Sequence, residues 1–153
     1  MNKEAQGAEA EKFVSAKLPV DRSLIRSGRL LNMIEVVEVL PAPDRNRTLW
    51  QLLVDAGADV DHIVYRDAED ERPGGRGPAL QFRVDTSKLK GFLVIEVAEV
   101  ERGFRLLMQN QECSVLQTAI ECVFLRDLPE KVASLIDDGT RRWNDAVRRH
   151  IVT

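Results

Sequence analysis

The stretch LQFRVD at residues 80–85 alternates apolar and polar side chains without a break, and it decides the fold class. Strict alternation is typical of a β-strand with one face toward a core and the other toward solvent. Further strands are expected around 63–65, 92–100, 104–108 and 115–126, with short links between the last four strands. Because short links join antiparallel neighbours, the sequence predicts an antiparallel meander.

The residues before this meander are expected to form one strand and one short helix. Segment 30–40 is ambiguous, because its apolar spacing suits a helix while its β-branched residues suit a strand. The strand is favoured, since Gly28 and Pro41 bracket the segment. A short helix capped by Asp44 should follow, and Gly57 stands where a left-handed residue commonly ends a helix.

A long amphipathic helix is expected to close the chain. Asp127 and Glu130 form a capping-box pattern with Pro129 in the first turn, which predicts a helix over 129–150. Its apolar stripe must dock on the sheet, because no other apolar surface is large enough. The stripe recurs at intervals of three and four residues, at Val132, Leu135, Ile136, Gly139, Trp143, Ala146, Val147 and Ile151.

These elements predict an α+β fold, with a curved antiparallel β-sheet packed around a long C-terminal α-helix and short helices near the N-terminus. The 153 residues are 44% hydrophobic and 31% charged, which is ordinary globular usage and is typical of one domain. We expect residues 1–29 to be a polar leader with weak helical potential. Residues 30–153 should form a single α+β domain.

Charge and hydropathy narrow the partners and the compartment. A formal net charge of −3 argues against binding to nucleic acid. The most apolar segment, 92–97, is far shorter than the ~20 residues of a membrane span. Residues 1–11 lack the apolar core of a secretion signal. Cys113 and Cys122 would lie roughly 30 Å apart on extended chain, too far for a disulfide, and these features together predict a cytoplasmic protein.

The opening of the predicted domain resembles that of a known superfamily. The segments IEVVEVLPAP at 34–43 and LWQLLVD at 49–55 are similar to the first strand, proline-containing turn and tryptophan-bearing helix of the START/polyketide-cyclase-like (SRPBCC, helix-grip) superfamily. The order of elements over 30–150 also resembles that superfamily. The leader is additional, and only 56–61 is available for the family's second short helix.

The resemblance implies a cavity between the sheet and the C-terminal helix that holds a hydrophobic small molecule. Gly139, on the inner face of the predicted helix, would give that cavity room, and Tyr65 and Thr118 would supply its polar contacts. A closed core, in which Gly139 only lets the helix approach closely, remains open. The residues expected to line the cavity are Tyr65, Phe82, Val84, Met108, Thr118, Ile120, Gly139 and Trp143.

No catalytic constellation is recognisable, and neither a cofactor nor a metal is predicted. His62 lies between acidic residues in what should be a solvated turn, and His150 suits the end of a helix. The two cysteines and two histidines lack the tight spacing of zinc ligands. Hydrophobic small-molecule binding is therefore the first functional hypothesis. The alternative is a protein–protein interaction module, homodimeric or not, without a small-molecule ligand.

Overall fold

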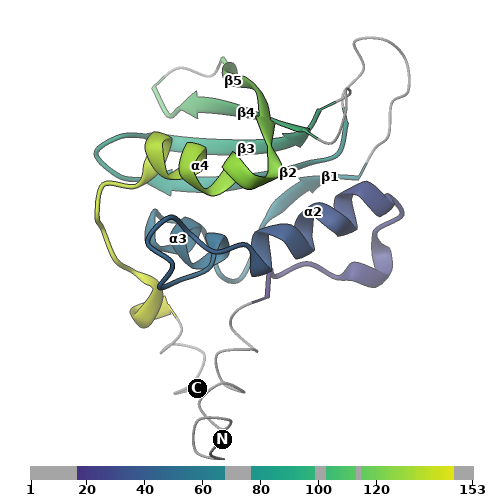
Figure 1. Ribbon diagram of the computed structural model, residues 1–153, viewed down its shortest axis with the longest axis horizontal. Coiled ribbons are helices and arrows are strands. Elements are labelled where there is room, and N and C mark those ends of the chain that lie inside the picture. The colour runs from purple at the N-terminus through teal and green to yellow at the C-terminus, as the bar shows by residue number, and fades with distance from the viewer. Residues whose placement is uncertain (1–16, 68–76, 99–102, 113–114, 147–153) are drawn as a thin grey trace, which may run out of the picture.

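The computed structural model describes residues 17–67, 77–98, 103–112 and 115–146 (Figure 1). No helix in these ranges has the length and hydropathy needed to cross a bilayer. The chain is α+β, as predicted. Its elements are η1 (Arg22–Leu24), α2 (Gly28–Val39), α3 (Leu49–Asp55), β1 (Val64–Arg66), β2 (Ala79–Asp85), β3 (Lys90–Val97), β4 (Gly103–Asn110), β5 (Gln117–Phe124), η2 (Leu125–Asp127) and α4 (Leu128–Ile136).

The five strands form one open antiparallel sheet in sequence order, β1-β2-β3-β4-β5. The register pairs Phe82 with Leu93 and Leu93 with Met108, so these three side chains share a face. The predicted meander is therefore confirmed. The buried residues on this inner face of β2, β3 and β4 include Leu80, Phe82, Val84, Leu93, Ile95 and Leu106.

The three α-helices of the described residues, α2, α3 and α4, cover this inner face of the sheet (Figure 1). One continuous core contains the inner strand residues together with the buried residues of α2, α3 and α4. Trp50 from α3 sits next to Phe82 from β2, with their ring centroids 6.1 Å apart. The far face carries only a small separate cluster of Ala79, Val94 and Leu107. Most of the buried apolar side chains of the sheet therefore lie on one face.

Segment 30–40 was predicted as a strand, and this prediction was wrong, because the segment belongs to helix α2. The Ser27 hydroxyl caps the helix by accepting a hydrogen bond from the backbone N–H of Leu30 at 3.1 Å. β-Branched residues lower helix propensity by only about half a kcal/mol each. Burial of a complete stripe outweighs that cost. The buried stripe consists of Leu30, Met33, Ile34 and Val37.

The sequence predicted that Asp44 caps helix α3. In the structure the cap is Thr48 instead. Thr48 Oγ1 accepts from the N–H of Gln51, and the Gln51 side chain accepts from the N–H of Thr48, which completes a capping box. Asp44 instead accepts hydrogen bonds in the preceding turn. At the other end Gly57 has φ +124°, so its predicted left-handed conformation is confirmed.

The C-terminal helix is shorter than predicted. Helix α4 begins at Leu128 with Pro129 in its first turn, but it ends at Ile136, and a helical turn resumes only at 143–146. The rest of the predicted helix, 147–150, lies outside the described residues. A long helix gripped by the sheet is therefore not what covers the inner face.

Side chains of the chain itself end α4. The carboxylates of Asp137 and Asp138 accept hydrogen bonds from the N–H groups of Gly139 and Thr140, at 3.1 and 2.9 Å. Such local bonds offer the backbone an alternative to helix. Gly139 then takes φ +94° and is exposed, so it does not lie on the inner face of a helix as expected.

The described part of the predicted leader packs against the domain. Leu18 and Ile25 are buried in the same core as α2. The Glu38 carboxylate of α2 accepts a hydrogen bond from the N–H of Leu18 at 2.6 Å and pairs with Arg22. Residues 17–27 thus contribute side chains to the core, although the sequence predicted that the domain starts at residue 30.

The capping box generates a stability prediction. Thr48→Ala should lower the free energy of unfolding by about 1 kcal/mol, because the N–H of Gln51 at the start of α3 loses its acceptor, Thr48 Oγ1. Thr48→Ser should retain most of that stability. The matched control is Thr118→Ala at an exposed strand position, which should change it by less than about 0.5 kcal/mol. Equal losses for both alanine variants in urea titrations would contradict the capping role.

Candidate functional site

The residues predicted to line one cavity are spread over the molecule. Phe82 and Val84 are buried in the closed core, where Tyr65, Met108, Ile120 and Trp143 pack only at its margin. The other two, Thr118 and Gly139, are exposed. Of all eight residues, only Trp143 lines one of the two cavities described below.

Thr118 lies on the far face of the sheet, away from the helices, because β5 is irregular. Leu106 pairs with Ile120, but the next residue of β4, Leu107, pairs with Thr118, so β5 carries Ala119 as an extra residue. Leu107 belongs to the small cluster on the far face. Thr118 therefore follows Leu107 to the side of the sheet opposite the helices, while Ile120 stays on the inner side.

A cavity of about 890 Å³ opens at one end of the inner face. We call it the α2–η2 groove. The start of α2 forms one wall, and the junction of β5 and η2 forms the opposite wall. The adjoining ends of β3 and β4 lie between these two walls. Its lining residues are Gly28, Arg29, Asn32, Val97, Ala98, Gly103, Phe104, Phe124, Leu125 and Arg126.

The walls of the groove are mainly apolar. Phe124 and Leu125 are 54% and 43% exposed, although both are large hydrophobic residues. A second extra residue in β5 precedes them, because Phe104 pairs with Val123 while Leu106 pairs with Ile120. Bulges of this kind redirect side chains. Val123 enters the core, and the following Phe124 lines the groove.

The ionisable side chains that line the groove are both arginines, Arg29 and Arg126. Arg29 Nη2 donates a hydrogen bond to the Ala98 carbonyl at 3.2 Å, which holds the guanidinium against the groove wall. Arg126 is exposed at the opposite wall. Asp67 lies near this end of α2, where it accepts hydrogen bonds from the N–H groups of Arg26 and Ser27.

The groove has free space beside α2. A Cβ atom added to Gly28 would meet nothing within 4 Å, whereas one added to Gly103 would lie 3.3 Å from Cys122 Sγ. Gly28 is therefore a residue of the groove lining where an added Cβ would meet no described atom, and Gly103 marks a packed wall.

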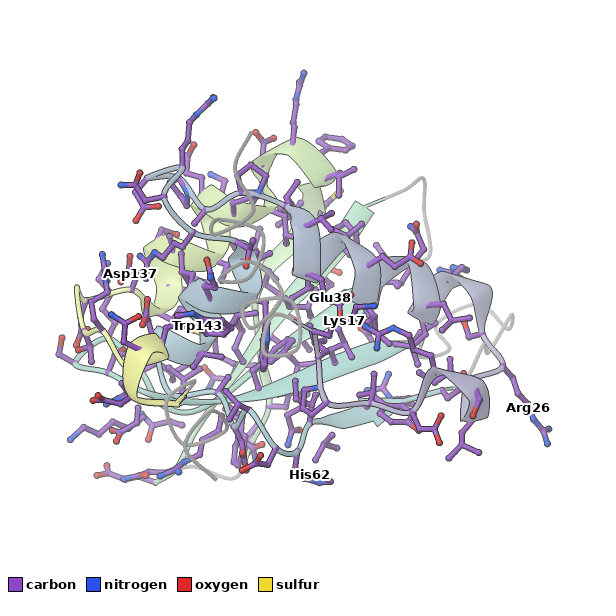
Figure 2. The ribbon with its side chains drawn as sticks, turned by 90° about the horizontal axis from the view of Figure 1, so that it is seen from below. Lys17, Arg26, Glu38, His62, Asp137 and Trp143 are labelled. Carbon is purple, nitrogen blue, oxygen red and sulfur yellow. The ribbon has the colours of Figure 1, made fainter. Side chains whose placement is uncertain are left out.

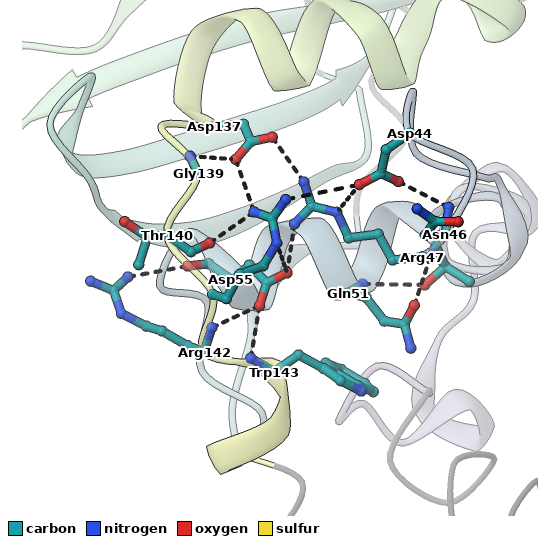
Figure 3. Close-up of polar contacts among 12 residues, drawn as sticks. Asp44, Asn46, Arg47, Gln51, Asp55, Asp137, Gly139, Thr140, Arg142 and Trp143 are labelled. Atoms are coloured by element: carbon teal, nitrogen blue, oxygen red, sulfur yellow. Dashed lines mark hydrogen bonds and ion pairs between the residues drawn. The ribbon is translucent and has the colours of Figure 1, made fainter.

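A second, polar cavity of about 620 Å³ lies beside α3 and the C-terminal segment. Its central group is the Asp55 carboxylate, whose side chain is only 4% exposed (Figure 3). Asp55 Oδ1 accepts from the backbone N–H groups of Arg142 and Trp143, at 2.7 and 2.8 Å. Asp55 Oδ2 accepts from Arg47 Nη1 at 2.5 Å. Asp55 thus caps the 143–146 turn from another helix.

Arg47 is the cationic partner in this cluster, with a side chain that is 9% exposed. Besides Asp55 it binds the carboxylates of Asp44 and Asp137, at 3.0 and 2.8 Å. Burial works to lower the pKa of Arg47, but the hydrogen bond to Asp55 and the charges of Asp137, Asp55 and Asp44 outweigh it and raise that pKa. The guanidinium therefore stays charged and joins three segments of the chain.

This polar cluster serves the fold. The Asp55, Arg47 and Asp137 groups already use one another as partners, so they attach the C-terminal segment to α3. Sequence reasoning missed the cluster. The available signal was Asp55 itself, a carboxylate at the end of the apolar helix segment LWQLLVD. The arginine partner, Arg47, stands eight residues earlier, and no periodic pattern connects it with Asp137.

The histidine, cysteine and acidic side chains were the candidates for metal binding. No cluster of three or more His, Cys, Asp or Glu side chains there could hold a metal ion. His62 is exposed at the surface (Figure 2). Cys122 is exposed as well. His150 and Cys113 lie outside the described residues.

Comparison with known proteins gives no family for this chain. Neither the scan against protein-family models nor the searches of curated proteins and of solved structures found a match. The groove and the polar cluster are therefore interpreted from their own geometry.

A single substitution in the Asp55 cluster should destabilise the protein strongly. Asp55→Asn keeps an oxygen for the two backbone N–H groups but leaves the buried Arg47 charge without its closest partner. We expect unfolding to become easier by about 3–5 kcal/mol, the usual cost of breaking a buried pair. Trypsin should also cleave faster at Arg141 and Arg142. Asp59→Asn, an exposed carboxylate change, is the control and should leave both readouts unaltered.

The loss of folding stability in acid should depend in part on Asp138. Hydrogen bonds from the N–H of Ser87 and from Thr140 lower the pKa of Asp138 well below its ordinary value. Because the folded-state pKa is depressed, the ionised group stabilises the fold above the unfolded pKa of about 4, and this contribution is lost as the pH falls. Asp138→Asn should therefore lose less stability than the parent between about pH 5 and about pH 2. Parallel pH profiles for the two proteins would refute this.

Proposed function

We propose that this protein binds a small apolar molecule in the α2–η2 groove. The observation that carries the proposal is a cavity of about 890 Å³ whose walls include the exposed side chains of Phe124 and Leu125. Ligand cavities commonly measure about 300–1,000 Å³ and are mostly apolar with a few polar groups. The groove has this size and this composition.

The groove is favoured over the inner face of the sheet as the binding site. Phe82, Leu93 and Leu106 are already covered by the three helices, so a ligand there would have to displace packed side chains. In the groove, a ligand would cover apolar surface that the fold leaves in water, which is favourable in proportion to the area covered. The proposed site still adjoins the C-terminal helix, since η2 leads directly into α4.

A distant relationship to the helix-grip superfamily is a further proposal. It is supported by an antiparallel meander followed by a helix that packs on its inner face. Most of the segment 34–40 that suggested the relationship is helical here. The binding proposal therefore rests on the groove alone.

A protein–protein interaction module remains the second candidate function. The observation that favours it is β5, an edge strand in the described sheet, which has Val115 60% exposed just before its start. Edge strands can pair with a second chain. The two extra residues in β5 oppose such pairing, because bulges interrupt the ladder that a new strand would need. For that reason the small-molecule function is proposed first.

Titration with the apolar fluorescent dye 1-anilinonaphthalene-8-sulfonate tests the binding site. Gly28→Leu should reduce dye binding at least about tenfold, because an added side chain enters open groove space. The same variant should be as stable as the parent or slightly more so, since glycine in a helix costs about 0.5–1 kcal/mol relative to alanine. Urea unfolding provides this second readout.

The matched control changes an exposed apolar residue at the opposite end of the same helix. Val39→Ser removes a side chain that is 71% exposed and does not line the groove. Dye affinity should remain within about twofold of the parent, because a scattered surface residue contributes little. Unchanged binding in Gly28→Leu, or an equal loss in Val39→Ser, would rule out the groove as the site.

A further inference from the structure

We infer that Asn32 determines which ligand the α2–η2 groove selects, and that this ligand is an uncharged apolar molecule with an amide group. This inference rests on the proposed function, and it names both the class of ligand and the residue that recognises it. It combines a mainly apolar cavity with a side-chain amide in one of its walls.

Asn32 lies on the groove side of helix α2. It follows Gly28 by four residues, and both residues line the groove. Residues four apart in a helix are neighbours on its surface. The side chains of Leu30 and Met33, on either side of Asn32 in the sequence, are buried in the core, whereas Asn32 is exposed. The helix therefore places Asn32 beside Gly28 at the cavity.

The chemistry of the Asn32 side chain specifies the group that it can bind. Among the described lining residues, Asn32 has the one uncharged side chain with hydrogen-bonding groups. Its amide carries an acceptor oxygen and two N–H donors in one plane. A ligand amide offers the complementary donor and acceptor, so the two amides can form paired hydrogen bonds, as asparagine does with the edge of adenine. An apolar ligand without such a group would remove water from Asn32 and replace none of its hydrogen bonds.

The two ends of such a ligand would contact opposite walls of the groove. A Cβ atom added to Gly28 would meet no described atom within 4 Å, so a ligand amide can approach α2 beside Asn32. At the opposite wall, Phe124 and Leu125 are 54% and 43% exposed. An apolar ring system that covers them is favoured by burial, and its contact with the Phe124 ring adds to that gain.

The groove also contains two cationic side chains, Arg29 and Arg126. Arg29 is held at the wall by its hydrogen bond to the Ala98 carbonyl, and both side chains are exposed. Ion pairs at exposed positions contribute little to affinity, because water screens both charges. The uncharged amide is therefore assigned to the ligand, and a carboxylate probe tests this choice.

Three naphthalene probes separate the amide from the ring. Equilibrium dialysis with 1-naphthamide, 1-methylnaphthalene and 1-naphthoate, followed by naphthalene fluorescence, gives the affinity of each probe for the parent and for Asn32→Leu. The ratio of the naphthamide affinity to the methylnaphthalene affinity is compared between the two proteins, which cancels the difference in hydrophobicity between the probes. This ratio should fall about threefold to tenfold in Asn32→Leu, because the paired hydrogen bonds are lost.

The matched control makes the same substitution outside the groove. Asn46→Leu changes an exposed asparagine that does not line the groove, so the affinity ratio should stay within about twofold of the parent. Leucine is a better helix former than asparagine, so Asn32→Leu should fold, and urea unfolding checks this. Asn32→Ala removes the amide without adding a large apolar side chain and should lower the ratio in the same direction.

The outcomes distinguish this inference from the function on which it rests. An unchanged ratio in Asn32→Leu, together with loss of both probes in Gly28→Leu, would overturn the role of Asn32 and leave the groove as the binding site. Tighter binding of 1-naphthoate than of 1-naphthamide would identify an anionic ligand and would also overturn the inference. Binding of none of the three probes to the parent would overturn the proposed function as well.

Discussion

The whole structure depends on the need to cover one apolar face of a five-stranded sheet. Phe82, Leu93 and Leu106 lie in adjacent positions of that face, and burying such side chains contributes about 1.5–3 kcal/mol each. Within the described residues, the three helices α2, α3 and α4 cover this face, and none of them is long enough to cross the whole sheet alone. Because α2 and the η2–α4 segment approach from different parts of the chain, they leave the α2–η2 groove between them at one end of the sheet.

The position of the C-terminal segment depends on one buried carboxylate. Asp55 binds two backbone N–H groups and the guanidinium of Arg47, so the chain after α4 is held on α3. A buried ion pair is costly to form and more costly to break, because either charge left alone would be desolvated without a partner. The cluster therefore fixes where the chain goes after Gly139. The α2–η2 groove, the proposed binding site, lies at the other end of the covering layer.

The sequence predicted those features that are encoded locally. The alternation in 80–85 predicted a strand, the face that this strand buries and the strands beside it, because a period of two has one structural interpretation. Segment 30–40 was misassigned because helix and strand signals coincide there, and the helix that forms buries a complete apolar stripe and is capped by Ser27. Gly139 was placed on a helix because the apolar period continues regularly past it. In the structure, the hydrogen bonds that Asp137 and Asp138 accept end α4 before this residue. The groove was missed because it joins residues from distant parts of the chain, 28–32, 97–98, 103–104 and 124–126.

We propose that ligands enter the α2–η2 groove and leave the packed core closed. Intermolecular nuclear Overhauser effects between the naphthalene protons of bound 1-anilinonaphthalene-8-sulfonate and assigned side chains of the protein test it most directly. Contacts are expected with the rings of Phe104 and Phe124 and with the methyl groups of Val97. Contacts with Phe82 and Trp50, which form the closed core, would contradict it.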